Sequence, residues 1–572
     1  MAGIVYDDEQ LQAIEADGHV LVAAGPGSGK TGMLAGRGAR LLNSGPGVLA
    51  AVSFTQDSAK ELRSRILSQG PDGCGRRVVC GTFHSLSLRM LHESGGRRAR
   101  VINGGETFAL LKRAMQAADW REGWDEAVRC LEQAKSTLTP PSNPDIRRLL
   151  DSYESLLGSI GAIDFGAMLL RCVQGLRDGS LKPISATWML VDEAQDMDEV
   201  QLEWVKLHAR AGVSVTMVGD DDQAVYGWRY SLGIKGMESF ERDTCARRVL
   251  LQSNYRCAPE IVTAAGLLIV NNRSRMEKLP RATQPAGGTI DLVDAARRDD
   301  EAEFIVGQAK DCPNEWAVLA RTNKLLYSVE AACGKYRVPY IKRGGASLWD
   351  SALAGAIRGM LVDIEQGTAA RSIVQALLIT NVLDGAAGAR LEHDKDQGFE
   401  PILRQVESMI DPEDARKRRG VAVRELKQAW PAWVTNMRLG RVDLVIFGVA
   451  EWFKPLVSED DQNVVEAIVN VLTSRQGKVQ QRFIGLEGDK ESGTGLRLLT
   501  MHAAKGLEFE NCWVMACEEG ICPMLDGDLE EERRLFYVAM TRAKRRLVLS
   551  RLVGDKVKLS RFLREAKIVP GL

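Results

Sequence analysis

A glycine-rich loop follows a short apolar segment near the start of the chain. Residues 19–25 (HVLVAAG) lead into AGPGSGKT at 24–31, and a helical pattern comes next. Small residues in such a loop let backbone N–H groups surround phosphate oxygens at a helix N-terminus. A strand, a phosphate loop and a helix in this order predict an α/β domain built on a parallel sheet.

The loop and a later acidic pair predict nucleotide hydrolysis. We expect Lys30 to supply a cation for the β- and γ-phosphates and Thr31 a hydroxyl ligand for Mg²⁺. Asp192 and Glu193 end the apolar run TWMLVDEAQD (187–196), where Asp192 would hold Mg²⁺ and Glu193 would polarise the attacking water. The loop alone also suits a kinase, a GTPase or a motor, but the two motifs together favour ATP or GTP hydrolysis. The other loop residues expected to bind the nucleotide are Ala24 (glycine in the general pattern), Gly25, Pro26, Gly27, Ser28 and Gly29.

The rhythm of strands and helices predicts four domains. Apolar runs typical of buried parallel strands alternate with helical patterns in the first part of the chain and again after residue 288. Two long stretches have helical spacing only. We therefore expect two α/β cores, each with a mainly helical insertion. Their bounds are 1–85 and 185–257 for the first core, 86–184 for its insertion, 258–349 and 486–572 for the second core, and 350–485 for its insertion.

Composition excludes several classes of protein. Lys and Arg number 75 and Asp and Glu 76, so the formal charge of -1 does not indicate a nucleic-acid partner. The 11 cysteines form no C-x-x-C pair, which argues against a zinc ribbon or an iron–sulfur site. No apolar run approaches the roughly 18 residues of a membrane span, and the start of the chain lacks a signal-peptide pattern. We expect a cytoplasmic protein that has no membrane partner.

Ordered segments along the whole chain resemble superfamily 1 DNA helicases of the UvrD/Rep/PcrA type. In chain order they are SFTQDSAKEL (53–62), GTFHSLSLRML (81–91), IDFGAMLL (163–170), VDEAQD (191–196), VGDDDQAVYGWR (218–229), LLQSNYR (250–256), LLTMHAAKGLEFE (498–510) and EEERRLFYVAMTRA (530–543). The resemblance implies two RecA-like P-loop NTPase cores that use ATP and Mg²⁺. It also implies single-stranded DNA and single-strand/duplex junctions as partners, together with a protein adaptor or a second copy of the chain.

The resemblance further implies a role for each residue around ATP. Gln10 would hydrogen-bond adenine, Tyr255 would stack on it, and Glu508 would contact the ribose. Gln223 would detect the γ-phosphate and couple hydrolysis to movement. Two arginine fingers would reach the γ-phosphate from the second core and neutralise transition-state charge, namely Arg256 and Arg542.

A second set of residues would line the path of single-stranded DNA. Aromatic rings beside a cation suit base stacking and backbone contact, and a local track of this kind is averaged away in the net charge. The residues that the resemblance places on this path are Phe54, Thr55, Thr82, His84, Tyr226, Trp228, Arg229 and His502.

Some positions depart from the family pattern. Gly32 stands where relatives often have an arginine that clamps adenine, so base recognition would rest more heavily on Gln10 and Tyr255. Gln56 and Asp57 replace the usual Asn-Lys pair near the expected DNA path. The second insertion matches poorly, and relatives differ there in duplex contact and autoinhibition.

We therefore expect an ATP-dependent DNA helicase that moves 3′→5′ on single-stranded DNA and unwinds duplexes, of bacterial, plasmid or phage origin, acting in DNA repair or replication. One alternative is a translocase that strips proteins from DNA and unwinds only with a partner or as a dimer. A catalytically inactive DNA-binding scaffold is a second alternative, and a GTPase or kinase that shares only the phosphate loop is a third. The intact catalytic residues argue against the scaffold, and Gln10 and Trp228 argue against the GTPase or kinase.

Overall fold

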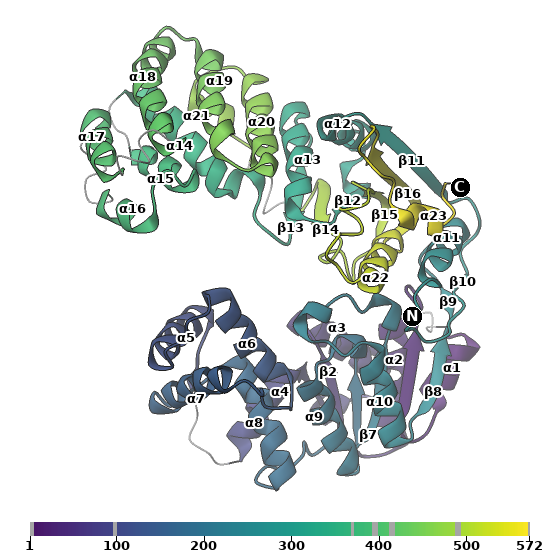
Figure 1. Cartoon of the computed structure of the whole chain (residues 1–572). Coiled ribbons are helices and arrows are strands. Elements are labelled where there is room, and N and C mark those ends of the chain that lie inside the picture. The colour runs from purple at the N-terminus through teal and green to yellow at the C-terminus, as the bar shows by residue number, and fades with distance from the viewer. Residues whose placement is uncertain are drawn as a thin grey trace. The chain divides into compact units, whose positions relative to one another are not determined.

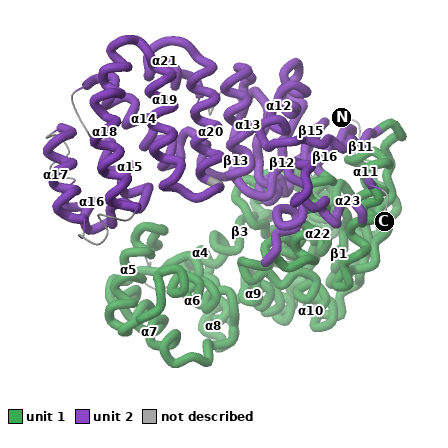
Figure 2. Tube along the Cα trace, turned by 45° about the horizontal axis from the view of Figure 1, so that its top comes forward, with its two compact units in different colours: residues 1–287, 527–541, 565–567 green, residues 288–526, 542–564, 568–572 purple. Residues whose placement is uncertain are grey.

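The computed structural model describes residues 5–94, 100–367, 371–391, 398–410, 418–486 and 493–569. The chain divides into two compact units, shown in green and purple in Figure 2. Unit 1 comprises residues 1–287, 527–541 and 565–567, and unit 2 comprises residues 288–526, 542–564 and 568–572. Each unit contains a six-stranded sheet in which every strand pair is parallel. The α/β class with two parallel-sheet cores is therefore confirmed.

The sheet of unit 1 has the strand order β3-β2-β6-β7-β1-β8. Its strands are β1 (Val20–Ala24), β2 (Leu49–Ser53), β3 (Val78–Thr82), β6 (Trp188–Val191), β7 (Ser214–Gly219) and β8 (Arg247–Leu251). The helices of unit 1 outside its insertion are α1 (Asp8–Glu15), α2 (Lys30–Ser44), α3 (Gln56–Gln69), α4 (Phe83–Glu93), α9 (Glu199–Arg210), α10 (Ile234–Thr244), α11 (Pro259–Ile269) and α22 (Leu529–Met540). A short parallel pair, β9 (Ser253–Asn254) and β10 (Arg281–Ala282), follows the last strand of the sheet.

Both faces of this sheet are covered, which explains why its strands are apolar without interruption. Side chains alternate between the two faces along β1. Leu21 packs in one hydrophobic cluster with Trp204, whereas Val22 packs in a second cluster with Met33. Every residue of β1 is fully buried. An uninterrupted apolar strand of this kind is typical of parallel sheets with helices on both sides.

Helices α5 to α8 form the insertion of unit 1, and Figure 1 shows them grouped beside its sheet. They are α5 (Gly104–Ala117), α6 (Trp124–Ser136), α7 (Pro144–Ser159) and α8 (Phe165–Asp178), joined by the short strands β4 (Arg100–Val101) and β5 (Ala162–Ile163). Three of the helices enclose a small core of their own around Leu111, Leu131 and Tyr153. The insertion is mainly helical, as predicted.

The sheet of unit 2 has the strand order β11-β16-β15-β12-β14-β13. Its strands are β11 (Thr289–Ala295), β12 (Trp316–Ala320), β13 (Tyr340–Arg343), β14 (Leu496–Thr500), β15 (Phe509–Val514) and β16 (Ala543–Leu552). Its helices are α12 (Arg298–Ala309), α13 (Asn323–Tyr336) and the short α23 (Arg561–Glu565), whose last residue is assigned to unit 1.

The insertion of unit 2 is also helical and has a large core, whose buried residues include Leu361, Leu426 and Phe453. Figure 1 shows its helices gathered apart from the strands of the same unit. They are α14 (Ala352–Gln366), α15 (Arg371–Ile379), α16 (Gly385–Leu391), α17 (Phe399–Met409), α18 (Arg418–Arg438), α19 (Val442–Phe453), α20 (Glu459–Thr473) and α21 (Val479–Phe483). Across the described ranges, none of the helices combines the length and the apolar character that crossing a membrane requires.

Candidate active site

The phosphate loop connects the carboxyl end of β1 to the first turn of α2. Gly27 and Gly29 have left-handed backbone conformations, with φ of +66° and +73°. A Cβ atom on Gly27 would lie 2.7 Å from the Cβ of Arg256, so no side chain fits there. The Ser28 hydroxyl donates to the Gly25 carbonyl at 2.8 Å and closes the loop. Within the described chain no side chain caps α2, so the N–H groups of its first turn suit a phosphate.

The predicted cation and acidic pair meet beside this loop. The Lys30 ammonium lies 3.7 Å from a carboxylate oxygen of Glu193. Asp192 and Glu193 follow β6, and Glu193 has the left-handed φ of +55°, a strained conformation that is frequent at functional sites. Burial and the neighbouring Glu193 carboxylate raise the pKa of Asp192 to about 7. The structure thus brings these three predicted catalytic residues together.

Thr31 and Asp192 offer the ligands that Mg²⁺ prefers, a hydroxyl and a carboxylate oxygen. Only 5% of Asp192 is exposed, and a divalent cation beside it would offset the burial that raises its pKa. The donor set therefore fits Mg²⁺, which when bound with a nucleotide neutralises negative charge on the β- and γ-phosphates.

A buried chain of hydrogen bonds links Glu193 to Gln223. The Gln195 amide nitrogen donates to Glu193 at 2.5 Å, and its oxygen accepts the backbone N–H of Asp220 at 2.9 Å. The Gln223 amide nitrogen donates to the Asp220 carboxylate at 2.5 Å. Gln195, Asp220 and Gln223 are all buried. One network therefore holds both Glu193, the predicted hydrolytic carboxylate, and Gln223, the predicted γ-phosphate sensor.

The two predicted adenine-binding residues also contact the loop region. The Gln10 amide nitrogen donates to the Ser28 carbonyl at 2.9 Å, and its oxygen accepts the backbone N–H of Asp7 at 3.2 Å. Asp7 caps α1 and also accepts the Tyr255 hydroxyl. The backbone N–H of Tyr255 donates to the Gly27 carbonyl at 2.9 Å. The start of α1 and the segment after β8 therefore meet at the phosphate loop.

Arg256 belongs to unit 1 and lies within the bounds predicted for the first core, whereas the resemblance implied that it acts from the second core. The Asn254 side chain explains this placement, because it donates to the Pro26 carbonyl at 2.8 Å and accepts the backbone N–H of Arg256 at 2.9 Å. The Arg256 guanidinium donates to the Thr541 carbonyl at 3.2 Å, also within unit 1. The segment that contains Arg256 is thus attached to the phosphate loop.

The remaining nucleotide-binding candidates, Arg542 and Glu508, lie close together in unit 2. Arg542 is buried, and its guanidinium donates to the Leu507 carbonyl at 3.0 Å. Glu508 forms an ion pair with Lys544 at 2.7 Å. The two residues are therefore neighbours at the start of β15 and the start of β16.

Four predicted DNA-binding residues lie at or just after the carboxyl ends of the adjacent strands β2 and β3. Thr55 and Thr82 cap α3 and α4, because each hydroxyl oxygen accepts the backbone N–H of the residue three positions later, at 3.1 and 3.2 Å. The half-buried Phe54 packs edge-on against Phe83, with ring centroids 5.7 Å apart. His84 lies in the first turn of α4, and burial lowers its pKa. These four residues therefore lie at the edge of the sheet of unit 1 where the carboxyl ends of β2 and β3 meet.

A second group follows β7. The Tyr226 and Trp228 rings lie edge to face, with centroids 6.4 Å apart. The guanidinium carbon of Arg229 lies 4.5 Å from the Trp228 ring centroid and 5.5 Å from that of Tyr226. Trp228 is 60% exposed, so its ring is open to a ligand. His502, the last predicted DNA-binding residue, belongs to unit 2 and follows β14.

The structure adds two residues that the sequence analysis did not select. Gln195 joins the network described above, and its position inside VDEAQD was the available signal. Phe165 is 55% exposed, and its ring lies edge-on to His84 with centroids 5.8 Å apart. The resemblance included the segment IDFGAMLL, but it did not indicate that Phe165 is the residue of this segment that contacts His84.

Comparison with known proteins now identifies the family. The family model described as UvrD/REP helicase N-terminal domain matches residues 6–244. The UvrD-like helicase C-terminal domain matches residues 249–354 and 459–553, so most of the chain is covered. The chain belongs to the UvrD-like helicase family. Residues 355–458, which include most of α14 and all of α15 to α19, lie outside both matches.

Similar curated proteins are named as DNA helicases. DNA helicase II of Escherichia coli is 29% identical over 98% of this chain and 87% of its own length. DNA helicase II of Haemophilus influenzae is 27% identical over 95% and 83%. The ATP-dependent DNA helicase PcrA of Leuconostoc citreum is 26% identical over 99% and 85%. The similarity to UvrD-like helicases therefore extends along nearly the whole chain.

Proposed function

We propose that the protein is an ATP-dependent DNA helicase that moves 3′→5′ along single-stranded DNA and unwinds duplexes. One observation supports this proposal most strongly. The buried network that begins at Glu193 ends at Gln223, and the exposed aromatic group begins three residues later at Tyr226. A short segment thus joins a hydrolytic site to a surface suited to DNA bases.

ATP binding and hydrolysis would divide among the residues around the loop. Gln10 and Tyr255 would bind adenine, without help from an arginine at position 32. Lys30 and the N–H groups of the loop would bind the β- and γ-phosphates, and Glu193 would orient the water and accept its proton. Thr31 and Asp192 would hold Mg²⁺, and Glu508 would contact the ribose. Arg256 and Arg542 would contact the γ-phosphate.

Movement would follow from the change that hydrolysis makes at Gln223. Loss of the γ-phosphate would release Gln223, and the shift would pass along the chain to Tyr226, Trp228 and Arg229. Closure of the two cores on ATP and opening after hydrolysis would alternate the contacts that grip the strand. Movement in one direction requires that the two cores bind DNA with different strength in the ATP-bound state and in the state after hydrolysis.

A second candidate function is a translocase that strips proteins from DNA and unwinds only with an adaptor protein or as a dimer. The observation that favours it is the part of the second insertion at 355–458, which neither family model matches. The resemblance implies that relatives differ in duplex contact in that part of the chain. For either function, we also propose that the protein acts in the bacterial cytoplasm and that its chain forms four domains.

Three measurements distinguish the two candidate functions. They are ATP hydrolysis with and without single-stranded DNA, separation of duplex strands, and displacement of a DNA-bound protein. The helicase proposal predicts DNA-stimulated hydrolysis together with strand separation by the protein alone. Stimulated hydrolysis and protein displacement without strand separation would favour the stripping translocase. Absence of ATP hydrolysis would contradict both.

A further inference from the structure

Lys278 is a buried lysine between α11 and β10, outside every motif described above. Its side chain is 1% exposed. The ammonium lies 2.7 Å from Asp220 and 3.3 Å from Asp222, and it also pairs with Asp221. Although burial alone lowers the pKa of a lysine, the three carboxylates raise the pKa of Lys278 well above its usual value. Lys278 is therefore a permanent cation at neutral pH.

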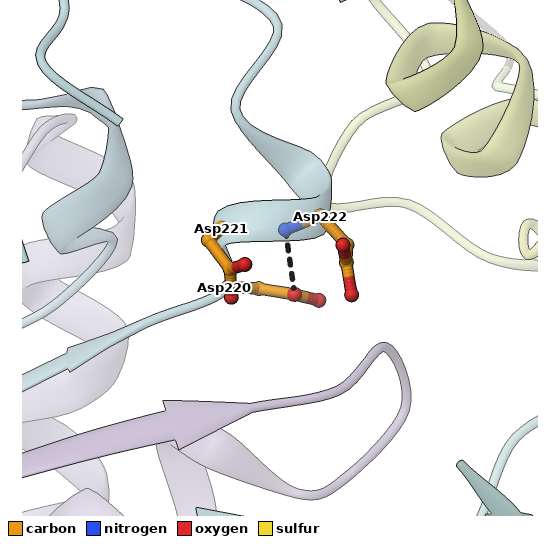
Figure 3. A group of neighbouring side chains, drawn as sticks. All are labelled: Asp220, Asp221 and Asp222. Carbon is orange, nitrogen blue, oxygen red and sulfur yellow. Dashed lines mark hydrogen bonds between the residues drawn. The ribbon is translucent and has the colours of Figure 1, made fainter. Parts of the chain in front are cut away.

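The three aspartates form one compact acidic cluster. Figure 3 shows Asp220 at the end of β7 and the other two on the short helix at Asp221–Gln223. One carboxylate oxygen from each lies within 4.8 Å of the others, a spacing that would also suit a metal ion. The cation among them is the Lys278 ammonium, and the Arg275 guanidinium donates to Asp222 at 3.0 and 2.8 Å. The cluster is thus an internal ion network that already contains its cations.

This network reaches the predicted γ-phosphate sensor through Asp220. Lys278 binds one oxygen of that carboxylate, Oδ1, and Gln223 donates to the other, Oδ2, at 2.5 Å. With Oδ1 held, the carboxylate cannot rotate freely, so Oδ2 and the Gln223 amide keep one orientation. The Lys278 ammonium also lies 3.4 Å from the carbonyl of Ala24, the first residue of the phosphate loop. Lys278 therefore contacts both the strand that begins the loop and the residue that orients Gln223.

We propose that Lys278 is a positioning residue for the γ-phosphate sensor: it fixes Asp220 so that the Gln223 amide is presented to the nucleotide in one orientation. The inference rests on the proposed function, since it assumes that Gln223 responds to the γ-phosphate. A purely structural lysine would neutralise buried charge without affecting how the site distinguishes ATP from ADP.

The test compares three single variants, Lys278→Met, Gln223→Ala and Lys206→Met, and the double variant of the first two. Lys206 is the matched control, because it is also buried in unit 1 and binds Ser239 and Asp243, both at 2.7 Å. Two measurements are made on each variant. The first gives kcat and KM of ATP hydrolysis with saturating single-stranded DNA, and the second gives the ratio of affinities for a slowly hydrolysed fluorescent ATP analogue and fluorescent ADP.

We expect Lys278→Met to lower kcat about tenfold, the loss expected for one positioning hydrogen bond, and to change KM by less than about twofold. The preference for the triphosphate should fall as it does in Gln223→Ala. The double variant should be no worse than Gln223→Ala alone, because the orientation of Asp220 has no effect once the Gln223 amide is absent. Lys206→Met should behave like the wild type in both measurements.

Three results would overturn the inference: a normal kcat and nucleotide preference in Lys278→Met, losses that add in the double variant, or the same losses in Lys206→Met. Normal behaviour of Gln223→Ala would instead contradict the sensor role in the proposed function. If Lys278→Met does not fold, the charge-balanced Lys278→Met/Asp221→Asn variant takes its place with the same expected values.

Discussion

Replacing Trp228 by alanine should weaken the grip on single-stranded DNA by an amount that the local geometry limits. Arg229 lies 4.5 Å from the ring centroid and covers one face, so only the opposite face can receive a base. One stacked base contributes about 1–3 kcal/mol, which corresponds to an increase in Kd of roughly 5- to 150-fold. Because 60% of the side chain is exposed, we expect the variant to fold.

The assay is fluorescence anisotropy of a labelled oligo-dT, with the DNA concentration that half-stimulates ATP hydrolysis as a second readout. Trp124→Ala is the matched control, since Trp124 is 36% exposed and also has an aromatic neighbour, Phe108, at 5.7 Å. It is the first residue of α6 in the insertion and is not among the residues proposed to line the DNA path. Unchanged DNA affinity in Trp228→Ala, or an equal loss in Trp124→Ala, would refute the stacking role.

Two further predictions concern catalysis and stability. Lys30→Ala should abolish ATP hydrolysis because it removes the cation beside Glu193, and a wild-type rate in a phosphate-release assay would refute the phosphate-loop assignment. Burial lowers the pKa of His208 from 6.5 to about 4, so its neutral ring stabilises the fold above pH 6.5 and that stabilisation is lost as pH falls toward 4. Between pH 7.5 and pH 5, urea unfolding should show the wild type losing about 2 kcal/mol more than a His208→Leu variant, and equal losses would contradict this.

Local patterns predicted the strands, loop and helix that build the candidate nucleotide site. HVLVAAG and GPGSGKT mark a strand, a loop and the start of a helix that together span Val20 to Ser44, and the acidic pair follows a second strand of the same sheet. Each of these elements is specified by adjacent residues, so periodicity and glycine placement were sufficient.

Contacts between distant segments were harder to predict. Lys278 lies in NNRSRMEKLPRA, a polar stretch in which nothing signals a fully buried lysine, because its three partners lie more than fifty positions earlier. The attachment of Arg256 to the phosphate loop was also not predicted, because the sequence does not show that Asn254 links this segment to Pro26. The net charge of -1 was similarly uninformative, since it sums over the whole surface rather than over one track.

The central claim is directional strand separation driven by ATP, and an unwinding assay with two DNA substrates tests it most directly. A duplex with a 3′ single-stranded tail and one with a 5′ tail are each incubated with protein, ATP and Mg²⁺, and Lys30→Ala serves as the inactive control. We predict that the 3′-tailed duplex is separated in an ATP-dependent reaction and that the 5′-tailed duplex stays intact. Separation of the 5′-tailed duplex alone would contradict the proposed polarity, and separation by Lys30→Ala would contradict the claim that ATP hydrolysis at this site drives it.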